Sequence, residues 1–164
     1  MQSRAILLET GADGLFPNGR SAMRRMLLAT DGSMGASRAT EVAAELASAT
    51  GSRLSILTVG GNISGEEMRQ LARAEGNAAD ALEELSNQVL RQAKERAEGA
   101  GVTDVRVQIG WGDPAELIIE TARREKADAI VIGRRGHGRL AGLLLGSVSQ
   151  KVATLAPCVV IVVP

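Results

Sequence analysis

Two short runs near the carboxyl end of the chain contain no polar side chain, and they constrain the fold more than any other feature. Val131-Ile132 leads into Gly133, and a second run extends from Val159 to Val163. Strands that are apolar at every position are typical of parallel sheets covered by helices on both faces. The sequence therefore predicts an α/β fold built around such a sheet.

Strands and helices are predicted to alternate along the chain. Short apolar runs bounded by turn residues predict strands at residues 25–30, 53–59, 102–109, 127–133 and 158–163. Apolar residues at helical spacing predict helices between these runs, and consecutive parallel strands then require right-handed crossovers. We therefore expect a five-stranded open parallel sheet with helices on both of its faces.

Several helix ends carry local signals. Ser33 is a suitable cap for the first helix and Gly51 is placed to end it, while Asp113-Pro114-Ala115-Glu116 predicts the start of another helix. The helical pattern from Glu66 to Glu98 is too long for one straight helix in a domain of this size, so we expect a break near Gly76. After this break the main helix is predicted to run from Asn77 to Glu98, and the apolar residues of its inward face are Ala78, Leu82, Leu85, Val89 and Ala93. The last helix is predicted from Ser147 to Leu155.

Length and composition favour one intracellular domain. Residues 1–22 show little periodicity and are predicted to form a flexible extension, or a cloning remnant, ahead of a single domain over residues 23–164. The lone Cys158 excludes an intrachain disulfide. The chain has no apolar run of membrane-spanning length and no recognisable leader peptide, so we expect a cytoplasmic protein.

Charge is balanced over the whole chain but not along it. Lys and Arg together number 19, as do Asp and Glu, yet no acidic residue occurs from Ala129 to Pro164. That segment carries Arg134, Arg135, Arg139 and Lys151, so anionic ligands are expected to prefer it. The chain has one Phe, one Trp and no Tyr, which argues against a protein that stacks bases of single-stranded nucleic acid.

A glycine-rich stretch follows the predicted fourth strand. Gly133 and Gly136 are followed by Gly146-Ser147, where the last helix is predicted to begin. Glycines allow backbone N–H groups to approach a phosphate closely, and the start of a helix adds free amides and a positive dipole end. Asp31 and Val59 follow two other strands, and the carboxyl ends of parallel strands meet at one edge of the sheet. The sequence therefore predicts a nucleotide site at that edge.

These residues resemble the universal stress protein family. The family signature is Gly, two residues, Gly, nine residues, Gly and then Ser or Thr, which matches Gly133, Gly136, Gly146 and Ser147 in spacing. The resemblance extends over residues 24–164. It also includes three further landmarks: Ala29-Thr30-Asp31-Gly32-Ser33, Gly112-Asp113-Pro114 and Ala156-Pro157-Cys158.

The resemblance implies a fold, a ligand and an assembly. The implied fold is adenine nucleotide alpha hydrolase-like, with strand order 3-2-1-4-5, and the intact glycine signature implies ATP, or ADP or AMP, as ligand. The implied ligand-binding residues are Ala29, Thr30, Asp31, Val59, Ile132, Gly133, Arg135, Gly136, Gly146, Ser147 and Val148. The resemblance also implies a homodimer paired through Val159 to Val163, which would protect a sheet edge that is otherwise open.

Several side chains at this site have both a functional and a structural interpretation. Asp31 is suited to accept from a ribose hydroxyl or to help hold Mg²⁺ with the nucleotide, but it also suits a turn or a helix cap. Arg134, Arg135 and Arg139 are placed to screen phosphate charge, or simply to face solvent. His137 is a candidate acid or base without an evident partner, and is interpreted as a solvated loop residue.

The expected function is nucleotide binding coupled to regulation. The chain lacks the P-loop pattern and its lysine, and no general base for water attack is evident, so rapid hydrolysis is not expected. The leading hypothesis is an ATP-binding stress sensor or regulator whose 134–145 loop responds to the nucleotide. A slow ATPase or nucleotide-activating enzyme is one alternative, and a nucleotide-free interaction protein is the other.

Overall fold

The computed structural model describes residues 23–61, 73, 76–137 and 145–164 of the chain. The predicted extension over residues 1–22, and Arg139 in the glycine-rich loop, lie outside the described residues. The flexible extension therefore stays a prediction. Within the part of the chain that is described, no helix is long and apolar enough to cross a lipid bilayer.

The described elements alternate between strand and helix. In chain order they are β1 (Arg25–Ala29), α1 (Met34–Thr50), β2 (Arg53–Val59), α3 (Gly76–Gly99), β3 (Val105–Gly110), α4 (Pro114–Glu125), β4 (Ala129–Gly133), α5 (Ser147–Leu155) and β5 (Val159–Val163). The strands form one sheet of order β3-β2-β1-β4-β5, and every neighbouring pair is parallel. The predicted fold class and strand order are confirmed.

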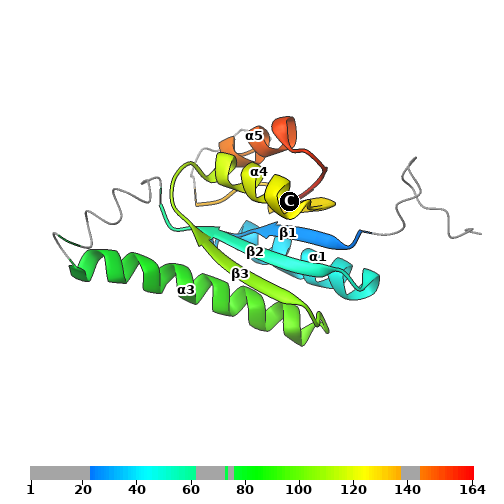
Figure 1. The fold of residues 1–164 in the computed structure, drawn as a ribbon, viewed down its shortest axis with the longest axis horizontal. Coiled ribbons are helices and arrows are strands. Elements are labelled where there is room, and N and C mark those ends of the chain that lie inside the picture. Colours follow the sequence, from blue (N-terminus) through cyan, green and yellow to red (C-terminus); the bar gives the residue numbers. More distant parts are fainter. Residues whose placement is uncertain (1–22, 62–72, 74–75, 138–144) are drawn as a thin grey trace, which may run out of the picture.

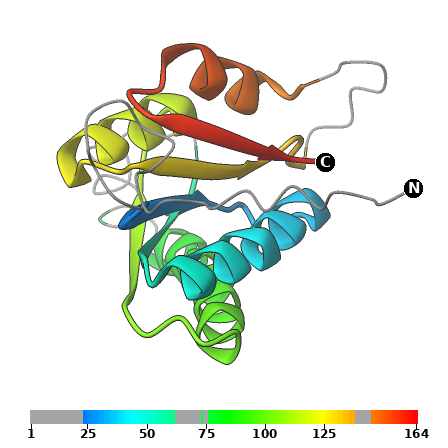
Figure 2. The ribbon, with the colours of Figure 1, turned by 90° about the vertical axis from the view of Figure 1, so that its right-hand side faces the viewer.

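The sheet lies between two pairs of helices (Figures 1 and 2). Helices α1 and α3 cover one face, and α4 and α5 cover the other. Successive residues of β1 alternate between the two faces: Met26 and Leu28 pack toward α1 and α3, whereas Leu27 and Ala29 pack toward α4 and α5. Two hydrophobic clusters therefore stabilise the sheet, one on each side.

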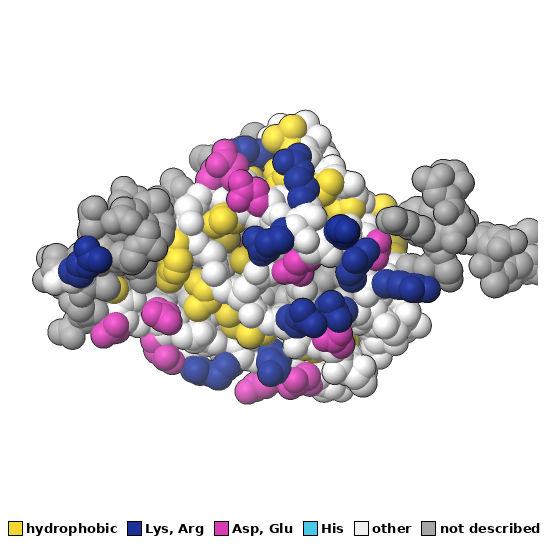
Figure 3. Space-filling model, viewed as in Figure 1, with side chains coloured by type: hydrophobic (Ala, Val, Ile, Leu, Met, Phe, Trp, Pro, Cys, Tyr) yellow, Lys and Arg dark blue, Asp and Glu magenta, His cyan; other side chains and the backbone are white. Residues whose placement is uncertain are grey.

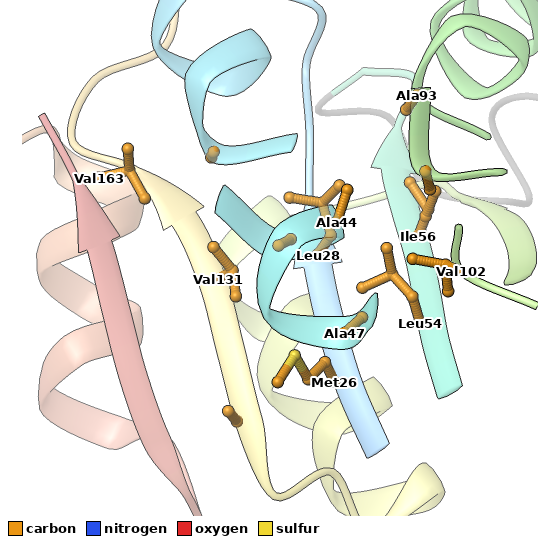
Figure 4. Close-up of a cluster of buried hydrophobic side chains, with 14 of the residues drawn as sticks. Met26, Leu28, Ala44, Ala47, Leu54, Ile56, Ala93, Val102, Val131 and Val163 are labelled. Carbon is orange, nitrogen blue, oxygen red and sulfur yellow. The ribbon is translucent and has the colours of Figure 1, made fainter. Parts of the chain in front are cut away.

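Helix α1 packs closely on the sheet because its inward face consists mainly of alanine. Ala39, Ala43 and Ala47 are each at most 1 % exposed, and Figure 4 shows α1 crossing the strands directly above Met26, Leu28 and Val131. Both predicted ends of this helix are confirmed. The Ser33 hydroxyl accepts from the N–H of Ala36 at 3.3 Å, and Gly51 ends the helix at φ 64°.

Some predicted boundaries were wrong. The third strand begins at Val105, not Val102, because the N–H of Val102 donates to the carbonyl of Ala97 and closes the end of α3 at 3.1 Å. The fourth strand begins two residues later than predicted, since the Asp128 carboxylate instead accepts from the N–H groups of Arg24 and Arg25. The fifth strand likewise begins at Val159 rather than at Cys158.

The predicted inward line of α3 was also partly wrong. The helix itself covers Gly76–Gly99, close to the predicted span. However, Leu85 is 60 % exposed, whereas Ser86 and Leu90 are buried against the sheet. Ala93 is buried as predicted, but Ser86 and Leu90 take the buried positions predicted for Leu85 and Val89. The buried Ser86 is accommodated because its hydroxyl donates to the carbonyl of Leu82 at 2.9 Å.

Candidate functional site

A cavity of about 360 Å³ opens at the carboxyl edge of the sheet. Strand order reverses between β1 and β4, and in open parallel sheets this is the place where ligands bind. The cavity is lined by every residue that the resemblance implied: Ala29, Thr30, Asp31, Val59, Ile132, Gly133, Arg135, Gly136, Gly146, Ser147 and Val148. Residues from the ends of three strands, β1, β2 and β4, and from α5 are thus brought together around one space.

One wall of the cavity is apolar. Leu57 and Val59 reach it from β2, and Ile118 reaches it from α4. Leu57 and Val59 share a face of β2 because side chains alternate along a strand. Ala29 and Ile132 complete the wall from β1 and β4. Such a surface suits a flat aromatic ring more than a charged group.

The loop after β4 approaches the start of α1 so closely that it leaves no room for side chains. A Cβ at Gly133 would lie 2.8 Å from the carbonyl carbon of Gly35, and a Cβ at Gly35 would lie 2.6 Å from the carbonyl oxygen of Arg135. Both distances are shorter than Cβ contacts in proteins. Glycine is therefore required here by the close approach of two backbone segments, a reason different from the predicted approach to a phosphate.

Helix α5 begins at the cavity without a side-chain cap. Gly146 occupies the cap position with φ −72° and ψ 160°, and no side chain accepts from the first turn. The N–H of Gly146 and the hydroxyl of Ser149 both donate to the carbonyl of Arg134, at 2.9 and 2.8 Å. These bonds attach the helix start to the strand end. The first-turn amides and the positive end of the helix dipole lie beside the cavity.

Asp31 uses one carboxylate oxygen in its own turn and presents the other to the glycine loop. Its Oδ1 accepts from the N–H of Ser33 at 3.0 Å, an Asx-turn that precedes α1. Its Oδ2 occupies the space into which a Cβ at Gly136 would project. Asp31 therefore has the predicted turn role through Oδ1, and Oδ2 faces the glycine loop on the cavity side.

His137 has a partner that the sequence did not reveal. Its Nε2 lies 2.9 Å from the main-chain oxygen of Asp31, so it connects the glycine loop to the end of β1. The side chain is exposed and lines the cavity mouth. His137 is thus a solvated loop residue, as predicted, but it also bridges the two segments.

Comparison with known proteins identifies relatives of this chain. A model of the universal stress protein family matches residues 23–164. The chain belongs to the universal stress protein family. A family member from Thermus aquaticus is 38% identical over 146 residues, which cover 85% of this chain and 98% of that protein. Universal stress protein Rv1636 of Mycobacterium tuberculosis is 33% identical over 152 residues, which cover 87% and 97%.

Solved structures, among them those of universal stress proteins, share the fold. One was determined in complex with cAMP; it is 31% identical to this chain, covers 87% of it and 98% of its own length, and superposes with a TM-score of 0.66. The hypothetical protein MJ0577 is 27% identical, covers 87% and 96%, and has a TM-score of 0.74. Both likenesses extend over the whole described sheet.

The cations of this universal stress protein are distributed differently from what charge counting suggested. Lys151 pairs with Asp113 at 3.3 Å and Glu116 at 3.1 Å, so its charge is largely offset at the start of α4. The N–H of Glu116, and then Lys151, lower the pKa of Asp113. Among the described cations of the acid-free segment, Arg135 is the one that lines the cavity.

The described residues contain no cluster of three or more metal-ligating His, Cys, Asp or Glu side chains. Asp31 is the one carboxylate among the described residues that line the cavity. A cation at this site would therefore depend on oxygens supplied by a ligand as well as on Asp31.

Several residues that line the cavity were not predicted: Ala36, Leu57, Pro114, Ile118, His137, Leu145, Ser149 and Gln150. Two of them follow from periodicity once neighbouring residues are known. Leu57 lies two residues before Val59, and Ile118 lies one helical turn after Pro114. The positions from His137 onward depend on how the chain after β4 folds back, which has no local sequence signal.

One corner of the site region carries the single tryptophan. A Cβ at Gly60 would overlap the ring of Trp111, and the hydroxyl of Ser86 would lie 2.8 Å from the same Cβ. The indole therefore lies directly over the backbone that follows Val59. This contact connects the ends of β2 and β3 to the middle of α3.

Proposed function

We propose that this universal stress protein binds an adenine nucleotide, in the first place ATP, in the cavity at the carboxyl edge of its sheet. The observation that carries the proposal is the pairing of an apolar wall with an uncapped helix start across one space of suitable size. A family member solved with cAMP, 31% identical to this chain, supports an adenine nucleotide as the ligand class.

The two sides of the cavity differ in polarity, and this difference determines the orientation of the bound nucleotide. The adenine ring packs against Leu57 and Val59, where apolar contact is available. The phosphates lie against Gly146 and Ser147, where the amides of the first turn of α5 and the helix dipole favour negative charge. The free carboxylate oxygen of Asp31 lies between these ends and accepts from a ribose hydroxyl.

Mg²⁺ enters this proposal only through the nucleotide. Asp31 is the side chain that would contribute an oxygen, with the phosphates supplying the others. The ion would neutralise phosphate charge beside Arg135. A simple comparison of ATP affinity with Mg²⁺ and with excess EDTA tests this contribution.

We further propose that binding serves regulation rather than rapid turnover. The described lining residues include no lysine to contact the terminal phosphates, and the Nε2 of His137 already contacts the carbonyl of Asp31. Slow hydrolysis is the alternative that single-turnover assays with excess protein would reveal. A nucleotide-free interaction role is the second alternative.

Isothermal titration with ATP, ADP, AMP and cAMP tests the central claim. We expect binding with micromolar affinity for at least one of them, and we expect purified protein to release an adenine nucleotide detectable by mass spectrometry. Absence of binding by all four up to millimolar concentration would sink the proposal and favour the interaction role. GTP serves as the control, because the guanine base differs in its hydrogen-bonding edge.

We also propose a homodimer that pairs β5 with its copy, and a cytoplasmic location. The strand lies at the edge of the sheet, bonded on one side to β4, and its first residue Val159 is 40 % exposed. Pairing of two copies across a two-fold axis would cover this apolar edge. Light scattering at micromolar concentration tests the assembly, and cell fractionation tests the location.

A further inference from the structure

The edge of the sheet opposite the cavity carries a cluster of arginines, which we call the amino-edge patch. It comprises Arg25, Arg53, Arg106 and Arg124. These residues are far apart in the sequence. Parallel pairing places Arg25 beside Arg53 in register, and Ser55, two residues further along β2, beside Arg106.

All four side chains belong to the face of the sheet that α4 covers. Arg25 alternates with Leu27, which packs toward α4 and α5, so both side chains lie on that face. Arg106 alternates in the same way with Gln108, whose amide donates to Glu125 at 2.8 Å and accepts from Arg124 at 3.0 Å. The last turn of α4 is thus hydrogen-bonded to β3 through Gln108.

The ion pairs within the patch leave positive charge in excess. Asp104 is shared between two guanidinium groups, Arg53 at 2.7 Å and Arg106 at 3.8 Å, which together lower its pKa. Arg25 lies 4.0 Å from Asp128, and Arg124 lies 3.9 Å from Glu125. The four arginines therefore face three carboxylates.

Lys126, which directly follows α4, adds a further exposed cation beside the patch. Lys and Arg side chains accordingly gather over β2, β3 and the end of α4 in Figure 3, with single acidic side chains interspersed between them. For a chain with zero net charge, this is a local positive surface.

Two of the four arginines, Arg106 and Arg124, are accessible enough to exchange partners. The Arg106 and Arg124 side chains are 63% and 61% exposed, and the shared Asp104 is 48% exposed. Ion pairs at such exposure are weak, so replacing one carboxylate by another from a partner costs little. Guanidinium groups also bind carboxylates through two parallel hydrogen bonds, which favours them over lysine at interfaces.

We propose that the amino-edge patch is a docking surface for an acidic polypeptide segment of a partner protein. The interleaved Asp104, Glu125 and Asp128 would repel the continuous phosphate charge of nucleic acid, whereas separate carboxylates can pair with the arginines one at a time. The patch residues also include no aromatic ring on which bases could stack. The proposal does not depend on nucleotide binding, because the patch lies at the other end of the strands.

Fluorescence anisotropy with a fluorescein-labelled oligoglutamate peptide tests the docking surface. We expect the full-length protein to bind it at low ionic strength and to release it as salt is added. The triple variant Arg53→Gln/Arg106→Gln/Arg124→Gln should bind about tenfold more weakly, since three exposed ion pairs are lost.

Two further variants make the result specific to this surface. The control Arg91→Gln/Lys94→Gln/Arg96→Gln removes the same charge from α3 and should bind as the unmodified protein does. Asp104→Asn removes the carboxylate that two arginines share, so it should tighten binding by about threefold. Thermal unfolding of each variant verifies that the fold is retained.

The proposal is overturned by any of three results. These are failure of the unmodified protein to bind oligoglutamate at low ionic strength, equal weakening by the α3 control, and no gain from Asp104→Asn. Duplex DNA or phosphatidylserine vesicles are tested in parallel. Patch-dependent binding to either that is tighter than binding to oligoglutamate would assign the surface to that polyanion and also overturn the proposal.

Discussion

The carboxylate of Asp31 occupies the space into which a side chain at Gly136 would project. This contact holds the turn after β1 against the loop after β4, on the two sides of the point where strand order reverses. Because the Oδ2 atom is at the end of the Asp31 side chain, the carboxylate can move aside without disturbing the backbone. Ligand binding and folding should therefore respond differently to changes at Gly136.

Gly136→Ala is expected to weaken ATP binding while leaving stability nearly unchanged. The added methyl group displaces the Asp31 carboxylate, and with it the proposed ribose acceptor, at a cost to affinity of about tenfold. Gly136→Val should abolish binding. Isothermal titration measures the effect, and Gly99→Ala is the control because a Cβ there meets nothing within 4 Å. Unchanged ATP affinity in Gly136→Val would contradict the assignment.

Gly133→Ala is expected to destabilise the fold itself. Its Cβ would lie 2.8 Å from the carbonyl carbon of Gly35 and 3.0 Å from the nitrogen of Ala36, and backbone cannot move aside as a side chain can. Overpacking of this kind costs roughly 1–3 kcal/mol. Urea unfolding of Gly133→Ala beside Gly99→Ala measures the difference, and equal midpoints would show that α1 is free to shift.

Asp113 is expected to make stability fall in acid. The N–H of Glu116, and then Lys151, hold the pKa of this helix cap below its ordinary value of 3.8. A carboxylate with a lowered folded pKa stabilises the protein fully above its ordinary pKa. That contribution is lost as pH falls through the lower folded value.

Asp113→Asn should therefore flatten the dependence of stability on pH below about pH 4, because asparagine caps a helix without a charge to titrate. Thermal unfolding at a series of pH values measures this slope. Glu98→Gln removes one exposed carboxylate elsewhere and serves as the control. A slope identical in Asp113→Asn and the unmodified protein would show that the cap does not contribute to acid sensitivity.

Val159→Lys is expected to prevent dimerisation if two copies pair through β5. A charged side chain on an edge strand opposes pairing with another strand. Val107→Lys is the matched control, since Val107 lies on β3 at the other edge of the sheet with similar exposure, 44 % against 40 %. Light scattering should give half the mass for Val159→Lys only. Loss of the dimer in Val107→Lys instead would move the interface to β3.

Local signals made much of the fold predictable. Ser33, Gly51 and Asp113 each specify a helix end through hydrogen bonds or backbone conformation within a few residues, and each was confirmed. Leu85 was different, because helical spacing alone does not determine which of two adjacent stripes faces the sheet. That choice depends on the neighbouring strands, where the small Ser86 fits and Leu85 does not.

The surroundings of the cavity were predictable to the extent that topology determines them. Asp31, Val59 and Gly133 end strands of a parallel sheet, so they had to meet at one edge. The bond from His137 to Asp31 depends instead on the path of a loop between distant segments. The amino-edge patch could not be predicted from the sequence for a related reason, since Arg53 and Arg106 become neighbours only through strand pairing.

The position of Trp111 over Gly60 has a practical consequence. The protein contains one tryptophan and no tyrosine, so its ultraviolet emission arises from a single known place. That indole lies over Gly60, which directly follows the cavity-lining Val59. Unlabelled protein therefore carries an intrinsic optical reporter, whose intensity should change when a ligand shifts the end of β2, and which follows binding in real time without chemical modification.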